Sequence, residues 1–152
     1  MAERPLDAQH QFLEQALRES EDRYRRLLAS VTDYVYTVEL KGGQPVRTIH
    51  SPGCVRVTGY TAQEYAADPQ LWIRMVDRRD RKAVVEQATR VRSGMEVKPI
   101  EHRIIHKDGT TRWVRNIPVR RYNEQGTFIA YDGLISDITA YKQAEEAKIR
   151  EQ

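Results

Sequence analysis

Histidine and cysteine, which often act as metal ligands, nucleophiles or general bases, are few in this sequence. It contains four histidines and one cysteine, Cys54. His50, His102 and His106 fall on strand-like segments without a paired-cysteine motif or a carboxylate pair nearby, and His10 is equally isolated. A Ser-His-Asp grouping, a zinc-protease motif and a glycine-rich phosphate loop are also missing from the sequence. We therefore predict that the protein is not an enzyme, that it has no metal site, and that Cys54 is a small buried hydrophobic residue.

Length and composition narrow the class of protein further. The 152 residues suffice for one domain with additional helices. The net charge of +3 is too small to favour nucleic-acid binding, because several basic side chains must converge on phosphates. No apolar run reaches the roughly 18 residues that would span a bilayer, and the N-terminus lacks the apolar stretch of a signal peptide. With a single cysteine, which cannot form an internal disulfide, we expect a cytoplasmic protein without direct membrane insertion.

Residues 1–31 are predicted to form a long amphipathic, coiled-coil-like helix. Apolar or weakly polar residues recur there at alternating steps of four and three, which is the spacing of a coiled-coil seam, at Leu6, His10, Leu13, Leu17, Ser20, Tyr24, Leu27 and Val31. Most other positions are charged, so the seam needs a partner, either the rest of its own domain or a second copy of the helix. We expect a homodimer held in part by Leu13, Leu17, Tyr24 and Leu27.

The rest of the chain predicts an α+β fold. Strand-like alternation occurs over residues 33–40, 46–50, 97–106, 110–122 and 127–136. Short helices are predicted over residues 54–67, a longer helix over 77–94, and a polar linker helix from residue 138 onward. This order favours one antiparallel five-stranded sheet with covering helices. We divide the chain into an N-terminal helix over residues 1–31, a core over 32–137 and the start of a C-terminal helix over 138–152.

Four short motifs follow one another along this framework. They are Glu19-Ser20-Glu21-x-Arg23-Tyr24-Arg25, Thr58-Gly59-Tyr60, Lys107-Asp108-Gly109-x-x-Arg112-Trp113-Val114 and Gly133-Leu134-Ile135-Ser136-Asp137-Ile138-Thr139. Together they resemble a PAS sensor domain with its PAC segment. Two further segments look most like the subgroup common in bacterial sensor kinases and cyclic-dinucleotide enzymes, Asp68-Pro69-Gln70-Leu71-Trp72-Ile73 and Glu101-His102-Arg103-Ile104. The similarity extends from about residue 19 to about residue 147. It implies the PAS fold.

The resemblance also implies a function. We expect a cytoplasmic signal-input and dimerisation module that passes a change induced by a ligand or a partner to a C-terminal effector domain, such as a histidine kinase or a diguanylate cyclase. The alternative is a ligand-free protein–protein interaction domain whose pocket is filled by its own side chains.

Two cofactors known in PAS domains are disfavoured by particular residues. In this family the haem iron is usually coordinated by a histidine on the long helix, and residues 77–94 contain no histidine. The flavin photoreceptors carry their reactive cysteine after the Gly-Tyr segment, whereas Cys54 precedes Thr58-Gly59-Tyr60. Haem and covalent flavin are therefore not expected, which leaves an unknown small molecule or no ligand.

Strand phase and the resemblance indicate which side chains would line a cavity between the sheet and the helices. The candidates are Tyr36, Val38, Trp72, Met75, Val84, Ala88, His102, Ile104, Asn116 and Ile135. Taken singly, each is more simply a core residue. His102 and Asn116 are the polar members, and buried polar groups need hydrogen-bond partners. We expect those partners to come from the protein rather than from a ligand.

Asp137 and Thr139 stand where the last strand passes into the C-terminal helix. Either side-chain oxygen could accept a hydrogen bond from the first free N–H groups of that helix. In the PAS family this junction also transmits the signal, because a shift of the last strand moves the outgoing helix. We therefore expect Asp137 and Thr139 to form the signal junction.

Overall fold

The computed structural model describes residues 6–151, except for the side chains of residues 6, 24, 25 and 27–31. Two compact units make up the chain, residues 1–31 and 32–152. In the first unit, helix α1 spans Leu6–Val31. Leu13 and Leu17 are both exposed on this helix, at 63% and 60% of the residue surface. Tyr24 and Leu27, the other two residues of the predicted dimer contact, lie outside the described side chains.

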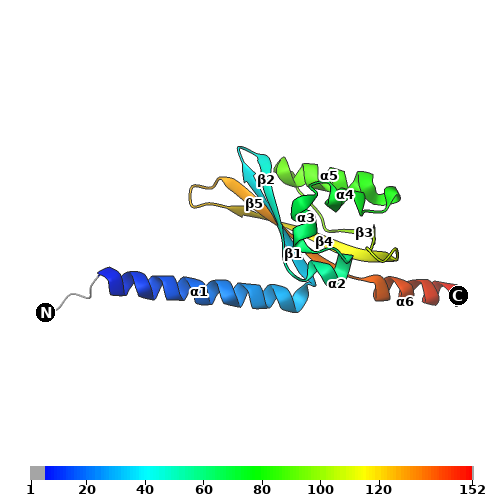
Figure 1. Ribbon diagram of the computed structural model, residues 1–152, viewed down its shortest axis with the longest axis horizontal. Coiled ribbons are helices and arrows are strands. Elements are labelled where there is room, and N and C mark those ends of the chain that lie inside the picture. The colour runs from blue at the N-terminus through cyan, green and yellow to red at the C-terminus, as the bar shows by residue number, and fades with distance from the viewer. Residues whose placement is uncertain (1–5, 152) are drawn as a thin grey trace. The chain divides into compact units, whose positions relative to one another are not determined.

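The second unit is built on a five-stranded antiparallel sheet, which confirms the predicted α+β class. Its strands are β1 (Tyr34–Lys41), β2 (Gln44–His50), β3 (Ile100–Ile105), β4 (Thr111–Tyr122) and β5 (Phe128–Asp137), in the spatial order β2-β1-β5-β4-β3 (Figure 1). Alternating side chains put Tyr34, Tyr36 and Val38 of β1 on one face. Gly42 and Gly43 turn the chain into β2 with positive φ angles of 59° and 78°, which glycine adopts without a steric penalty.

Short helices between β2 and β3 cover one face of the sheet (Figure 1). They are α2 (Cys54–Thr58), α3 (Ala62–Ala67), α4 (Leu71–Arg74), the 3₁₀ turn η1 (Arg78–Asp80) and α5 (Arg81–Arg92). Gly59 ends α2 in a left-handed conformation, and Thr61 with Glu64 forms the capping box that begins α3. The predicted helix over 77–94 is thus a 3₁₀ turn followed by α5, because Asp77 caps the turn by accepting from the N–H of Arg79.

The start of β1 and the end of β5 lie side by side in the sheet. Tyr34 pairs with Ile135, and the N–H of Asp33 donates to the carbonyl of Ile135 at 2.8 Å. Helix α6 (Thr139–Arg150) follows β5 directly. The chain therefore enters and leaves the sheet at the same end of the neighbouring strands β1 and β5, where hydrogen bonds join them. No helix in the described part of the chain is both long and apolar enough to cross a membrane.

Candidate functional site

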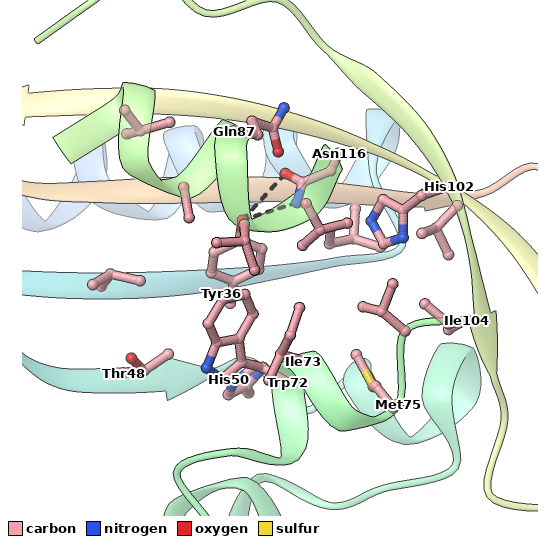
Figure 2. A pocket seen from close by; sticks show the side chains of 18 of the residues that line it. Tyr36, Thr48, His50, Trp72, Ile73, Met75, Gln87, His102, Ile104 and Asn116 are labelled. Atoms are coloured by element: carbon pink, nitrogen blue, oxygen red, sulfur yellow. Dashed lines mark hydrogen bonds between the residues drawn. The ribbon is translucent and has the colours of Figure 1, made fainter. Parts of the chain in front are cut away.

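A cavity of about 300 Å³ lies between the inner face of the sheet and helices α4 and α5 (Figure 2). All ten residues that the sequence suggested for a cavity line it. They converge from β1, β3, β4 and β5 on one side and from α4, α5 and Met75 on the other. Several further residues line the cavity without having been predicted to do so, among them Tyr34, Thr48, His50, Ile73, Gln87 and Tyr131.

Tyr36 and Asn116 form a polar pair on the floor of the cavity. The amide Nδ2 of Asn116 donates to the hydroxyl of Tyr36 at 2.9 Å, and that hydroxyl can donate to Oδ1 of Asn116 at 3.3 Å (Figure 2). Burial raises the pKa of the Tyr36 phenol. The expected protein partner of Asn116 is therefore present.

Gly133 makes this pair possible. Tyr36 is on β1 and Asn116 is on β4, so the phenol ring must cross the intervening strand β5. It crosses at Gly133, where a Cβ atom would overlap the ring. The backbone conformation of Gly133 is ordinary, so glycine is required here for space rather than for a positive φ angle.

His102 reaches the cavity from β3, and its hydrogen bonding differs from the expectation. The residue is only 4% exposed, and its Nδ1 has no hydrogen-bond partner among the described residues. Desolvation by burial lowers the pKa of the imidazole, which is therefore neutral at pH 7. The expectation of a protein partner fails at this nitrogen because the neighbouring inner-face residues of β3 and β4, Ile104 and Val114, are hydrocarbon.

His50 reaches the cavity from β2, at the opposite edge of the sheet. It is 8% exposed, and its Nδ1 likewise lacks a partner in the described part of the chain. Its ring stacks on Tyr65 with a centroid separation of 3.8 Å and an interplanar angle of 13°. Burial lowers the pKa of His50 from 6.5 to about 4. Its pairing with Tyr36 across the β1–β2 hairpin could have revealed this role, because paired residues share a face.

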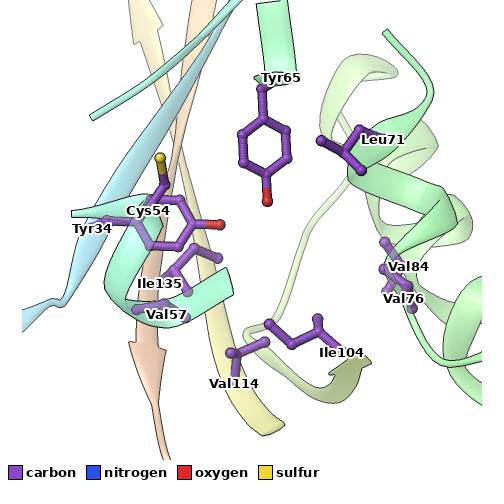
Figure 3. Packing of buried hydrophobic residues seen from close by; sticks show 10 residues of the cluster. All are labelled: Tyr34, Cys54, Val57, Tyr65, Leu71, Val76, Val84, Ile104, Val114 and Ile135. Carbon is purple, nitrogen blue, oxygen red and sulfur yellow. The ribbon is translucent and has the colours of Figure 1, made fainter. Parts of the chain in front are cut away.

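Cys54 lies in the packed core near Tyr34 and Val57 and does not line the described cavity (Figure 3). It is fully buried, and burial raises the pKa of its thiol, which disfavours the reactive thiolate. Helix α5 has no histidine to offer a haem iron. The two features that the resemblance associates with haem and with covalent flavin, a histidine on the long helix and a cysteine after the Gly-Tyr segment, are therefore not found at those positions of this sequence. The described residues also contain no cluster of three or more groups that could hold a metal ion.

The signal junction expected at Asp137 and Thr139 has a geometry only partly like the one expected. Oδ1 of Asp137 accepts from the backbone N–H of Thr139 at 2.9 Å, as a cap would. The hydroxyl of Thr139 instead accepts from the backbone N–H of Trp113 on β4 at 2.9 Å and lies 2.5 Å from Oδ1 of Asp137. Of the two side-chain oxygens that could have capped α6, that of Asp137 accepts from the helix, whereas that of Thr139 extends the hydrogen bonding of β4.

Trp113 and Lys142 add a second link between the sheet and α6. Nζ of Lys142 lies 4.9 Å from the centre of the Trp113 ring and 2.8 Å from a carboxylate oxygen of Glu101 on β3. The guanidinium carbon of Arg103 is 5.1 Å from the same ring centre. Hydrogen bonding to Lys142 is the main reason that the pKa of Glu101 is lowered. The first turns of α6 are therefore attached to β3 and β4 as well as to β5.

Comparison with known families agrees with this architecture. The sequence profile of the PAS fold matches residues 47–135, which is more than half of the chain. The chain belongs to the PAS-fold family. This confirms the resemblance found in the sequence. The PAC segment is not distinguished separately by that match.

Solved structures and curated relatives extend the comparison. A sensory box histidine kinase/response regulator from Burkholderia thailandensis superimposes with a TM-score of 0.62 at 20% identity, covering 83% of this chain and 92% of that one. The N-terminal domain of a diguanylate cyclase with a PAS/PAC sensor from Marinobacter aquaeolei gives a TM-score of 0.57 at 16% identity, covering 72% and 97%. At these identities the structures establish a shared fold.

Among curated sequences, a methyl sulfide methyltransferase-associated sensor from Methanosarcina acetivorans is 26% identical over 86% of this PAS chain. Protein y4lL from Sinorhizobium fredii is 30% identical over 89% of it. The chain spans only 13% and 16% of the lengths of these two proteins. A PAS unit of this kind thus occurs within much longer proteins.

Proposed function

We propose that this PAS unit is a cytoplasmic sensory input module that binds a small molecule in the cavity and passes the resulting change to a C-terminal effector. The observation that carries the proposal is the cavity of about 300 Å³, which is lined mainly by apolar side chains and by a few polar ones, among them His50, His102 and the Tyr36–Asn116 pair. The unit performs no catalysis in this proposal. Its output is a change in helix α6.

The contacts of α6 support that output. Strand β5 lines the cavity through Ile135 and reaches the helix two residues later through Asp137. Thr139 ties the beginning of the helix to Trp113 on β4. A ligand that displaces the inner face of β4 or β5 would therefore alter the hydrogen bonds that hold α6. Kinase and cyclase relatives of the same fold make a histidine kinase or a diguanylate cyclase the effector that we propose.

Dimerisation through α1 belongs to the same proposal. Leu13 and Leu17, exposed on successive turns of the predicted seam, would be covered by the α1 helix of a second copy. The alternative of a ligand-free interaction domain requires a pocket filled by side chains. The volume of the cavity favours a bound molecule over that alternative.

The test is to measure by mass spectrometry whether a small molecule is bound, and then to fill the cavity with a larger side chain. Native and denaturing mass spectrometry of the freshly purified protein should show a small molecule lost on denaturation. Ala88→Phe on α5 should abolish the bound mass, because Ala88 lines the cavity. Ala83→Phe, the same change at an exposed position of the same helix, should retain it.

The protein should also be screened against a metabolite library by thermal shift. A ligand that stabilises the wild type and the Ala83→Phe variant, but not the Ala88→Phe variant, would support the proposal. Absence of bound mass together with absence of any stabilising compound would overturn it and leave the interaction domain as the better description.

A further inference from the structure

Four polar side chains, one from each strand except β5, form a row that runs diagonally across the inner face of the sheet. In spatial order they are His50 on β2, Tyr36 on β1, Asn116 on β4 and His102 on β3. Strand β5 contributes Gly133 to the row, and the Tyr36 ring passes over it. All four side chains line the cavity (Figure 2). The row therefore runs from one edge strand of the sheet to the other.

The two middle residues of this row are hydrogen-bonded to each other, whereas each histidine at its ends has a ring nitrogen without a partner among the described residues. Tyr36 and Asn116 satisfy each other at 2.9 Å. His50 and His102 each retain a buried Nδ1 without a hydrogen-bond partner in the described part of the chain. Both imidazoles are more than nine-tenths buried, at 8% and 4% exposure. Both histidine side chains line the cavity, so a molecule in it would meet an imidazole near each end of the row.

The cavity offers very little charge to a ligand. Of the described lining residues, Arg92 is the only Lys, Arg, Asp or Glu, and its Nε donates to the carbonyl of Ala88 at 3.4 Å. The opposing wall is hydrocarbon, thioether and indole from Ile73, Met75 and Trp72. Burial of both histidines lowers their pKa, so neither supplies a positive charge at pH 7. Burying an ion without a counter-charge is costly, and Arg92 is the only described lining residue that could balance an ion. The lining therefore selects against a cation and against more than one negative charge, and it favours an uncharged ligand.

Building on the sensory function above, we propose that the ligand is an uncharged, elongated and largely apolar molecule with a hydrogen-bonding group at each end. One end pairs with His50 and the other with His102, while the apolar body lies over the Tyr36–Asn116 pair. A neutral imidazole presents one donor and one acceptor, so amide, phenol or carbonyl groups would all serve.

A matched series of para-substituted benzenes tests this assignment. Terephthalamide carries an uncharged polar group at each end, benzamide carries one, terephthalate carries two charges, and p-xylene carries no polar group. Calorimetric titration at pH 7 should give the tightest binding for terephthalamide, followed by benzamide and p-xylene. Terephthalate should bind at least about tenfold more weakly than terephthalamide, because Arg92 could balance at most one of its two charges.

Substitution of the two histidines distinguishes the contribution of hydrogen bonds to ligand affinity from that of the ligand's shape. His50→Phe and His102→Phe should each weaken terephthalamide binding about fivefold, the usual worth of one net hydrogen bond, and should leave p-xylene binding unchanged. His10→Phe on the exposed surface of α1 is the matched control and should change neither affinity. Thermal melts of all three variants should confirm that each is folded.

The outcomes distinguish this inference from the sensory function itself. Terephthalate binding as tightly as terephthalamide, or p-xylene doing so, would overturn the ligand class while leaving a ligand-binding cavity intact. A second outcome would also overturn only the ligand class. In it none of the four compounds binds, but native mass spectrometry finds a molecule bound to the wild type that is absent from the Ala88→Phe variant. If no probe binds, no bound mass is found and no compound of the metabolite library stabilises the protein, the ligand class and the sensory function are both overturned.

Discussion

At the scale of single residues, His50 couples the stability of the fold to pH. Its pKa is lowered by burial from 6.5 to about 4, with the rings of Tyr34, Tyr36 and Tyr65 around it. Between these values the unfolded state binds a proton that the folded state does not. We therefore predict that the free energy of unfolding falls as the pH is lowered from about 6.5 to about 4, by at most about 3 kcal/mol from this residue.

Urea titrations across that pH range will test this prediction. His50→Gln should flatten the dependence, and His102→Gln should flatten it further because the pKa of His102 is lowered for the same reason. His10→Gln on α1 is the control and should leave the slope as it is in the wild type. A wild-type slope that persists in the His50→Gln variant would contradict the assignment.

Gly133 supports a second prediction at this scale. A methyl group at this position would overlap the Tyr36 ring and force it away from Asn116. Gly133→Ala should destabilise the protein by about 1–3 kcal/mol, the usual cost of overpacking. Chemical denaturation will measure the loss.

The physical reason can be checked with a double-mutant cycle. In a Tyr36→Ala background the ring is absent, so Gly133→Ala should cost much less than it does in the wild type. An equal cost in both backgrounds would show that the glycine is needed for some other reason.

At the scale of elements, the connection of α6 to the sheet depends on Thr139. Its hydroxyl accepts from the N–H of Trp113 and contacts the carboxylate of Asp137. Thr139→Val keeps the shape of the side chain and removes these bonds, at a cost of about 1 kcal/mol for the first. We predict faster hydrogen exchange at the amide of Trp113 and through the first turn of α6, while β1 and β2 stay protected.

Two variants control for this effect. Thr139→Ser retains the hydroxyl and should behave as the wild type does, and Thr127→Val makes the same change at an exposed position before β5. In a fusion to a kinase or cyclase effector, Thr139→Val should alter signalling without preventing folding. Unchanged exchange together with unchanged signalling would show that the junction is only a connector.

At the scale of the whole molecule, the proposed dimer makes the oligomeric state depend on one face of α1. Leu13→Asp together with Leu17→Asp places charge on the seam, and we predict that sedimentation analysis will then show monomers. Gln11→Asp together with Gln15→Asp adds two acidic residues at exposed positions off the seam and should leave the dimer intact. A wild type that is already monomeric at high concentration would refute the proposed α1 dimer.

Local pattern is sufficient to predict much of the architecture. The alternation along β1 places Tyr36 and Val38 on one face, and the spacing along α5 places Val84 and Ala88 on another, so all four were predicted to line a cavity, and they do. Alternation and helical spacing are properties of a few consecutive residues and can be read without knowing the partners of an element. The motifs at Thr58-Gly59-Tyr60 and Asp137-Ile138-Thr139 then indicate the PAS fold.

Hydrogen-bond partners could not be predicted from local pattern, because they depend on residues distant in the sequence. Tyr36 and Asn116 are 80 residues apart and meet only because the sheet places β5, with Gly133, between their strands. Whether His102 finds a protein partner depends on which side chains its neighbouring strands present. The sequence left open whether Asp137 or Thr139 caps α6, and the hydroxyl of Thr139 accepts from Trp113 on β4 instead. The geometry of the cavity and of the signal junction therefore arises from the packing of the sheet, which a pattern along the chain does not specify.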